Sequence, residues 1–94
     1  MIRLTVQFSG HVQGVGFRYT ARNVASGHLV AGYVENQDDG SVLLVVEGEE
    51  ADVRAYLQEV GAAMGQYIHE QTVAASPPTG EFGVPGPGRL RVRH

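Results

Sequence analysis

The sequence predicts a small α+β domain in which two helices pack on one face of an antiparallel sheet. Three observations predict this class. The chain has 94 residues, of which 43% are hydrophobic and 18% charged, and this suits a single globular domain over residues 1–94 with one modest core. Several stretches alternate between apolar and polar residues, which is typical of half-buried strands. Two other stretches carry apolar residues every three or four positions, the period of an amphipathic helix.

The first strand and the first helix are predicted on either side of a glycine-containing loop. Arg3–Gly10 alternates in polarity, so one face of this strand is expected to be buried. The loop runs up to Phe17. Apolar residues at helical spacing then indicate a helix that begins near Arg18 or Tyr19 and ends near Gly27.

The next part of the chain is predicted to be a hairpin. Leu29–Asn36 and Ser41–Glu47 are both rich in strand-forming residues. Between them lies the turn Gln37–Gly40, whose Asp and Gly residues tolerate the backbone angles of a tight turn. The short spacing favours direct pairing of these two strands.

The second half predicts one longer helix and two weaker strands. The carboxylates of Glu49–Glu50 suit the positive end of a helix that closes near Gly65. Ile68–Ala74 is a weaker fourth strand, and Leu90–Val92 a short last one. Ser76–Gly88 holds all four prolines and four glycines, so it is expected to be a loop. The order β-α-β-β-α-β is the split β-α-β, or ferredoxin-like, arrangement.

Composition excludes several classes of function. The chain has no cysteine, which removes disulfide scaffolds and thiolate nucleophiles. Its net charge is −3, so nucleic acid is not an expected partner. No apolar run is long enough to cross a membrane, and the N-terminus lacks the layout of a signal peptide. We therefore expect a cytoplasmic protein without a membrane partner, and a monomer.

The stretch between the first strand and the first helix has the features of an anion site. Gly14 and Gly16 let successive backbone N–H groups converge on one point, and the helix start adds unpaired N–H groups. Arg18 can bind two phosphate oxygens through its planar guanidinium. The Gly-Lys-Ser/Thr ending of a nucleotide P-loop is absent. From spacing alone, a tight turn beside an exposed arginine remains an equal alternative.

Two separated blocks closely resemble the signature of the acylphosphatase family. They are Gly10–Arg18 and Gly32–Val42, and the similarity extends over about residues 3 to 64. The resemblance implies metal-independent hydrolysis of small acyl phosphates, with no cofactor and with inorganic phosphate or sulfate as a competing anion. It also implies that Arg18 binds the phosphate and that Asn36 holds the attacking water. The expected phosphate-binding residues are Gln13, Gly14, Val15, Gly16, Phe17 and Arg18.

Other polar residues have ordinary structural explanations. Asp38 and Asp39 are interpreted as turn residues, since neighbouring strand residues point to opposite faces and do not suit one metal. The four histidines are scattered without metal-ligand spacing. Phe17 is expected to anchor the loop to the core. Glu35 could repel an anionic substrate, but strand alternation places it on the opposite face from Asn36.

Two alternatives to a free-standing enzyme remain open. The same fold could serve as a non-catalytic module that binds phosphate or another small molecule. The chain also resembles the acylphosphatase-like domain at the start of the hydrogenase-maturation carbamoyltransferases. The absence of zinc-finger cysteines favours the free-standing enzyme over this last alternative.

Overall fold

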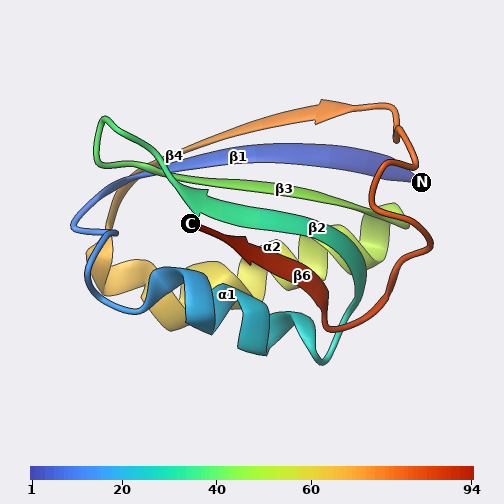
Figure 1. The fold of residues 1–94 in the computed structure, drawn as a ribbon, viewed down its shortest axis with the longest axis horizontal. Coiled ribbons are helices and arrows are strands. Elements are labelled where there is room, and N and C mark those ends of the chain that lie inside the picture. The colour runs from blue at the N-terminus through green and yellow to red at the C-terminus, as the bar shows by residue number, and fades with distance from the viewer.

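The alternating and helical stretches of the sequence form one sheet backed by two helices in the computed structural model, which describes residues 1–94 (Figure 1). All the predicted elements are present, and a 3-10 turn and one two-residue strand are added. In chain order they are β1 (Ile2–Gly10), α1 (Phe17–Ala25), β2 (Leu29–Asn36), β3 (Val42–Gly48), α2 (Glu50–Met64), η1 (Gly65–Tyr67), β4 (Ile68–Ser76), β5 (Gly86–Pro87) and β6 (Arg89–Arg93).

The sheet has the strand order β4-β1-β3-β2-β5, and β6 also pairs with β2. The pairs among β1 to β4 are antiparallel, which confirms the predicted fold class. The β2–β6 pair is parallel, with Ala31 opposite Arg89 and Glu35 opposite Arg93. The sequence predicted an antiparallel sheet and did not predict this parallel pair. It arises because the chain leaves β4 at one edge of the sheet and crosses to the other edge before β6 begins.

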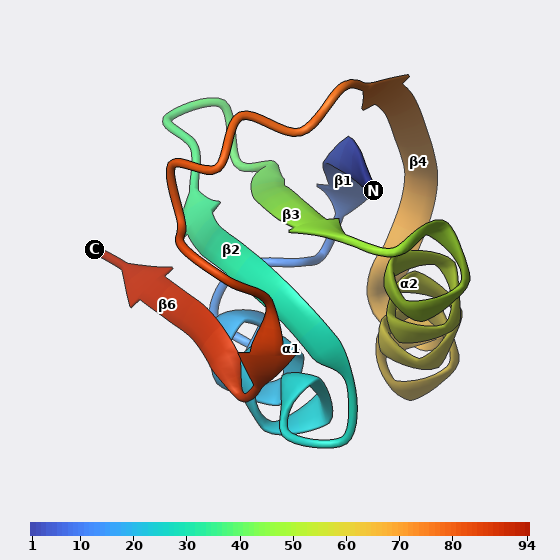
Figure 2. The same cartoon turned by 90° about the vertical axis from the view of Figure 1, so that its right-hand side faces the viewer.

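One face of the sheet packs on the helices and holds the core. Figure 2 shows both helices on one side of the sheet and the segment that leads to β6 on the other. Alternate residues of β1, such as Leu4, Val6 and Phe8, are fully buried beneath α1 and α2. Tyr56 of α2 is also fully buried and donates a hydrogen bond of 2.8 Å to the carbonyl of Ala21 in α1. Burial raises the pKa of this phenol far above its usual value.

Small differences from the predicted boundaries have local causes. Helix α1 begins at Phe17, directly after its N-cap Gly16, because the left-handed backbone of Gly16 cannot be part of a right-handed helix. The expected loop over residues 76–88 contains the end of β4 and the two residues of β5, which pair with the start of β2. Neither helix combines the length and the apolar character needed to span a membrane.

Candidate active site

The loop between β1 and α1 presents unpaired backbone N–H groups at the start of the helix. Gly14 and Gly16 both have a φ of 78°, which favours glycine. Gly16 is the N-cap of α1 and no side chain caps the helix. The first intrahelical bond runs from Thr20 N to the carbonyl of Gly16, at 3.0 Å. The first turn carries no acidic residue. Its N–H groups and the helix dipole therefore favour an anion from solution.

Apolar side chains hold this loop against the core while its glycines stay exposed. Val12 is fully buried and Val15 packs against the core from a half-buried position. Phe17 is 2% exposed, and its ring centroid lies 4.9 Å from that of Phe8. The expectation that Phe17 anchors the loop is confirmed. The backbone of the loop is thus fixed without any side chain of its own reaching over Gly14 or Gly16.

Arg18 is held in place by the end of the chain. Its Nη1 donates a hydrogen bond of 2.8 Å to the carbonyl of Arg93 and lies 3.3 Å from Nδ1 of His94. Both contacts involve the same guanidinium nitrogen, so Nη2 and Nε remain for an anion. The side chain is half-buried, in the first turn of α1. A guanidinium fixed in this way loses less conformational entropy when it binds.

Gln13 links the loop to the β2–β3 turn. Its Nε2 donates to the carbonyls of Gln37 and Ser41, at 2.8 and 2.9 Å. The sequence suggested only a place for Gln13 in the phosphate loop and gave no sign of this cross-link. Its partners are main-chain carbonyls 24 and 28 residues away, so no side-chain pattern could have revealed them.

Asn36 lies at the end of the sheet that Gln13 and Arg18 contact. It is the last residue of β2 and is half-buried. Along the strand it follows the same face as Val34, which belongs to the core beneath the helices. Gln13 ties the loop to the residue after Asn36, and Arg18 contacts the end of β6, which pairs with β2. Figure 1 shows the C-terminus beside this end of β2. Asn36 and Arg18 are therefore at the same end of the sheet.

Glu35 belongs to the other face of β2. Its register partner is Arg93, whose guanidinium lies over the ring of Tyr33, 3.5 Å from the centroid. Tyr33 and Glu35 share one face because they are two residues apart on a strand. The expectation that Glu35 and Asn36 face opposite ways agrees with this placement.

The acidic residues after β2 form the turn, as the sequence predicts. The carboxylate of Asp39 accepts hydrogen bonds from the backbone N–H and the hydroxyl of Ser41, at 2.9 and 2.6 Å. The side-chain bond from Ser41, followed by the backbone bond, lowers the pKa of Asp39 below its usual value. Gln37 N and the carbonyl of Ser41 close the turn at 2.8 Å. The turn thereby presents to Gln13 the carbonyls that link it to the loop between β1 and α1.

Comparisons with known proteins identify the family of the chain. The family model described as Acylphosphatase matches residues 4–83. An acylphosphatase of Oceanobacillus iheyensis is 47% identical over 60 residues, which cover 64% of this chain. The matched part spans 66% of that relative, or just under two thirds of its length.

Two solved structures resemble the whole chain. The crystal structure of an acylphosphatase from Bacillus subtilis matches with a TM-score of 0.83 and 25% identity, covering 100% of both chains. HypF from T. kodakarensis matches with a TM-score of 0.75 and 30% identity, over 98% of this chain but only 12% of that one. The family model covers most of the chain, and the fold agrees along its full length. The chain belongs to the acylphosphatase family.

Proposed function

We propose that the chain is a metal-independent acylphosphatase, which hydrolyses the carboxyl-phosphate bond of small acyl phosphates to a carboxylate and inorganic phosphate. The main observation in support of the proposal is that no side chain caps the start of α1 after Gly16. Arg18 is fixed beside this helix start by its hydrogen bond to the end of β6. Family membership supports the same reaction.

The phosphoryl group would bind in the loop formed by residues 13–18. Its non-bridging oxygens would accept hydrogen bonds from the backbone N–H groups of Gly14–Arg18 and from the guanidinium of Arg18. In phosphoryl transfer the transition state spreads charge over these equatorial oxygens. Donors already fixed in place stabilise that charge without further reorganisation. In this proposal the protein's own donors take the role that a metal ion has in many phosphoryl-transfer enzymes.

Asn36 would hold the attacking water in line with the leaving group. Its side-chain amide can donate to or accept from a water molecule. The water oxygen forms a bond to phosphorus as the bond from phosphorus to the carboxylate oxygen breaks, and the carboxylate leaves with the bonding pair. A phosphate oxygen of the substrate would accept the proton of the water. No covalent intermediate is then needed, because a carboxylate is already a good leaving group.

A turnover assay separates this proposal from a non-catalytic module. The purified chain is given benzoyl phosphate in the presence of a chelator, and release of inorganic phosphate is followed. We expect turnover, with added inorganic phosphate as a competitive inhibitor because it occupies the same loop. Calorimetry with inorganic phosphate runs in parallel. Binding of phosphate without turnover of benzoyl phosphate would favour the module.

We also propose that residues 1–94 form a single domain that acts as a cytoplasmic monomer. The buried apolar residues form one cluster of 18, as expected of one folding unit. The absence of cysteine is compatible with a reducing compartment. Light scattering after size exclusion would give the mass in solution, and a mass of about 20 kDa, twice the 10.1 kDa of the chain, would contradict the monomer.

A further inference from the structure

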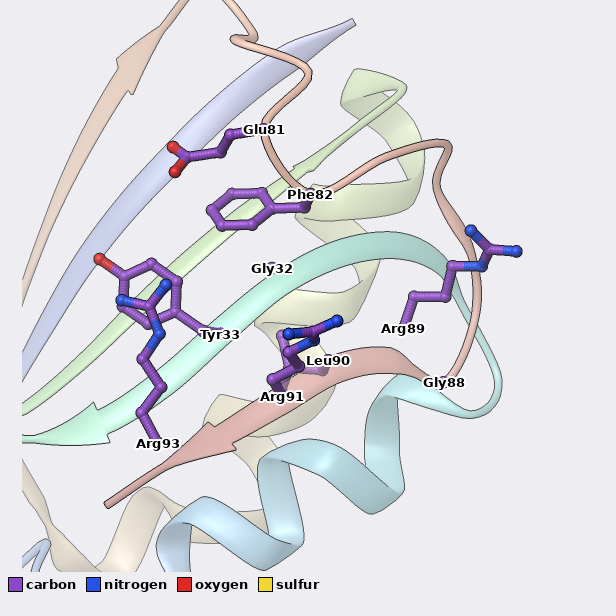
Figure 3. A pocket seen from close by; sticks show the side chains of 9 residues that line it. All are labelled: Gly32, Tyr33, Glu81, Phe82, Gly88, Arg89, Leu90, Arg91 and Arg93. Carbon is purple, nitrogen blue, oxygen red and sulfur yellow. The ribbon is translucent and has the colours of Figure 1, made fainter.

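A cavity lies on the sheet face away from the helices, apart from the phosphate loop. Its volume is about 490 Å³, within the usual range for small-molecule sites. It is bounded by β2, β6 and the segment that crosses the sheet before β6 (Figure 3). None of residues 13–18 lines it. Its lining residues therefore differ from those of the proposed catalytic site, although the carbonyl of Arg93, which lines it, accepts the hydrogen bond from Arg18.

Arginine side chains dominate this cavity. Arg89, Arg91 and Arg93 all line it, and they are three of the seven basic residues in a chain of net charge −3. They occupy alternate positions of β6, so all three point to the same face. Figure 3 shows them leaving the strand on the side that carries Tyr33 and Phe82. At a rise of about 3.3 Å per residue they extend over roughly 13 Å.

These three cations have no carboxylate partners within the chain. None of them takes part in the five ion pairs of the structure. Arg93 lies over the ring of Tyr33, and Arg89 donates to the carbonyl of Val84 at 3.1 Å. Arg91 has no such contact. Like charges on one short strand repel one another, so an anion bound among them would relieve that repulsion.

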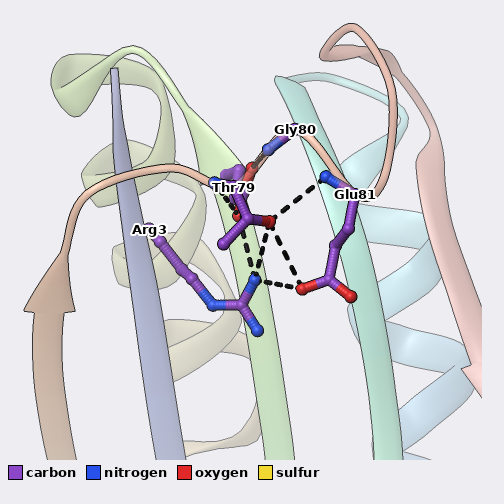
Figure 4. A network of polar contacts seen from close by, with 5 residues as sticks. Arg3, Thr79, Gly80 and Glu81 are labelled. Atoms are coloured by element: carbon purple, nitrogen blue, oxygen red, sulfur yellow. Dashed lines mark hydrogen bonds and ion pairs between the residues drawn. The ribbon is translucent and has the colours of Figure 1, made fainter.

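The acidic groups near the cavity are placed at its margins. Glu81 lines it, but its carboxylate pairs with Arg3 (Figure 4). Glu35 is the register partner of Arg93, at the opposite end of β6 from Arg89, and it does not line the cavity. Arg89 and Arg91 lie opposite Ala31 and Tyr33, so neither has an acidic register partner.

The wall of the cavity opposite β6, which includes Tyr33 and Phe82, is held in place by contacts within the chain. The site therefore exists before any ligand binds. The rings of Tyr33 and Phe82 meet edge to face, with centroids 5.7 Å apart. Glu47 in β3 is buried and accepts hydrogen bonds from the backbone N–H groups of Thr79 and Gly80, at 2.9 and 3.0 Å. These contacts hold the crossing segment on the sheet. A site formed in advance loses less free energy to ordering when it binds.

We propose that this cavity binds a small molecule that carries at least two phosphate or carboxylate groups. Neighbouring arginines of β6 are about 6.6 Å apart along the strand, so one ligand can engage two of them. Each guanidinium can bind a phosphate or a carboxylate through two hydrogen bonds. The proposal concerns binding alone, and it stands whether or not the chain hydrolyses acyl phosphates.

The test is a titration followed through the backbone amide signals of the ¹⁵N-labelled protein. Pyrophosphate and citrate serve as probes, because they carry phosphate and carboxylate groups respectively. We expect saturable shifts at residues 88–91 and at Phe82 with at least one probe, separate from any shifts at residues 14–18 and at Arg93, whose carbonyl contacts Arg18. Which probe binds more tightly identifies the phosphate or the carboxylate class. Shifts confined to residues 14–18 would overturn the proposal.

Two double variants decide whether the arginines of β6 are responsible. Arg89→Gln with Arg91→Gln removes two charges from the cavity and should weaken binding there tenfold or more, as expected for hydrogen bonds to charged groups. The control is Arg22→Gln with Arg54→Gln, which removes two exposed charges from α1 and α2. Binding should be unchanged in the control. Equal weakening in both double variants would show a non-specific charge effect and overturn the proposal.

Discussion

At the scale of single residues, the conformation of Gly16 decides where α1 begins and what its first turn can bind. A φ of 78° and a ψ of 20° place it in the left-handed region, which costs an ordinary residue about 1–2 kcal/mol. A Cβ at this position would meet no atom within 4 Å. A substitution there is therefore strained through its backbone and not through a steric clash.

Replacing Gly16 should destabilise the protein, whereas the same change in α2 should stabilise it. We expect Gly16→Ala to lower the free energy of unfolding by about 1 kcal/mol, because alanine resists the left-handed conformation. Gly61 lies inside α2, and a Cβ there also meets nothing within 4 Å. Gly61→Ala should raise the free energy of unfolding by up to about 1 kcal/mol, because alanine favours helix. Urea denaturation of both variants measures the difference, and equal signs would contradict the argument.

At the scale of elements, Gln13 links the loop of residues 13–18, the proposed phosphate site, to the β2–β3 turn. We expect Gln13→Ala to lower kcat/KM for benzoyl phosphate about tenfold, equivalent to roughly 1.4 kcal/mol. Two hydrogen bonds to the carbonyls of Gln37 and Ser41 are lost, and the donors of the loop shift. Small displacements of catalytic groups are enough to lower the rate.

Gln7 provides the matched control for this prediction. Its Nε2 donates to the hydroxyl of Ser41 at 3.0 Å, so it contacts the same turn. It lies in β1, however, and makes no contact with the phosphate loop. Steady-state kinetics of Gln7→Ala should match the parent chain. If Gln7→Ala and Gln13→Ala lost the same activity, the turn alone would explain the effect, and the positioning role of Gln13 would be wrong.

The buried carboxylate of Glu47 binds the segment between β4 and β6 through hydrogen bonds. The side chain of Glu47 is 4% exposed, and it accepts hydrogen bonds from Thr79, Gly80 and Arg3. Burial raises the pKa of this carboxyl, but the hydrogen bonds of Thr79 and Gly80 outweigh burial and leave the pKa below its usual value. The ionised form of Glu47 therefore stabilises the folded chain.

Acid should remove this stabilisation. A carboxyl whose pKa is lower in the folded state contributes stability that is present above the unfolded value, about 4.3, and lost as the pH falls through the folded value. We expect Glu47→Gln to lower the free energy of unfolding by about 2 kcal/mol at pH 7. The gap between the parent chain and the variant should narrow toward pH 3. Denaturation curves at both values test this, and a gap independent of pH would contradict it.

At the scale of the whole molecule, the sequence predicted the elements well and the long-range contacts poorly. β1 alternates between buried and more exposed residues, so its pattern is visible in the sequence. β2 and β3 are buried on both faces over part of their length, and their strand-forming residues predicted them instead. β4 is an edge strand, and almost all of it is exposed. Its weak pattern follows from this, because a strand without a buried face has little reason to alternate. The start of α1 was predicted to within one or two residues, and the burial of Phe17 was predicted as well.

The crossing segment and β6 could not be predicted in the same way. The Gly- and Pro-rich residues 77–88 have no period, and their path depends on Glu47 and on the ring of Tyr33. The parallel register of β6 depends on where that path ends. For the candidate site, the motif predicted which residues take part. It could not predict the contact between Arg18 and the carbonyl of Arg93, because these residues are 75 positions apart. Contacts of this kind leave no local trace in one sequence.

The proposed reaction depends most on Arg18 and Asn36. The bond from Arg18 to the carbonyl of Arg93, together with the pairing of β6 with β2, brings them to the same end of the sheet. The measurement that tests the proposed reaction most directly is benzoyl phosphate hydrolysis, with a chelator present, by the parent chain, Arg18→Ala and Asn36→Ala. Arg22→Ala serves as the control, since Arg22 is an exposed arginine on the same helix. We expect kcat to fall about 10²–10³-fold in the first two variants and to stay unchanged in the control. Full activity in Asn36→Ala would contradict the proposed water site, and full activity in Arg18→Ala would contradict the phosphate site itself.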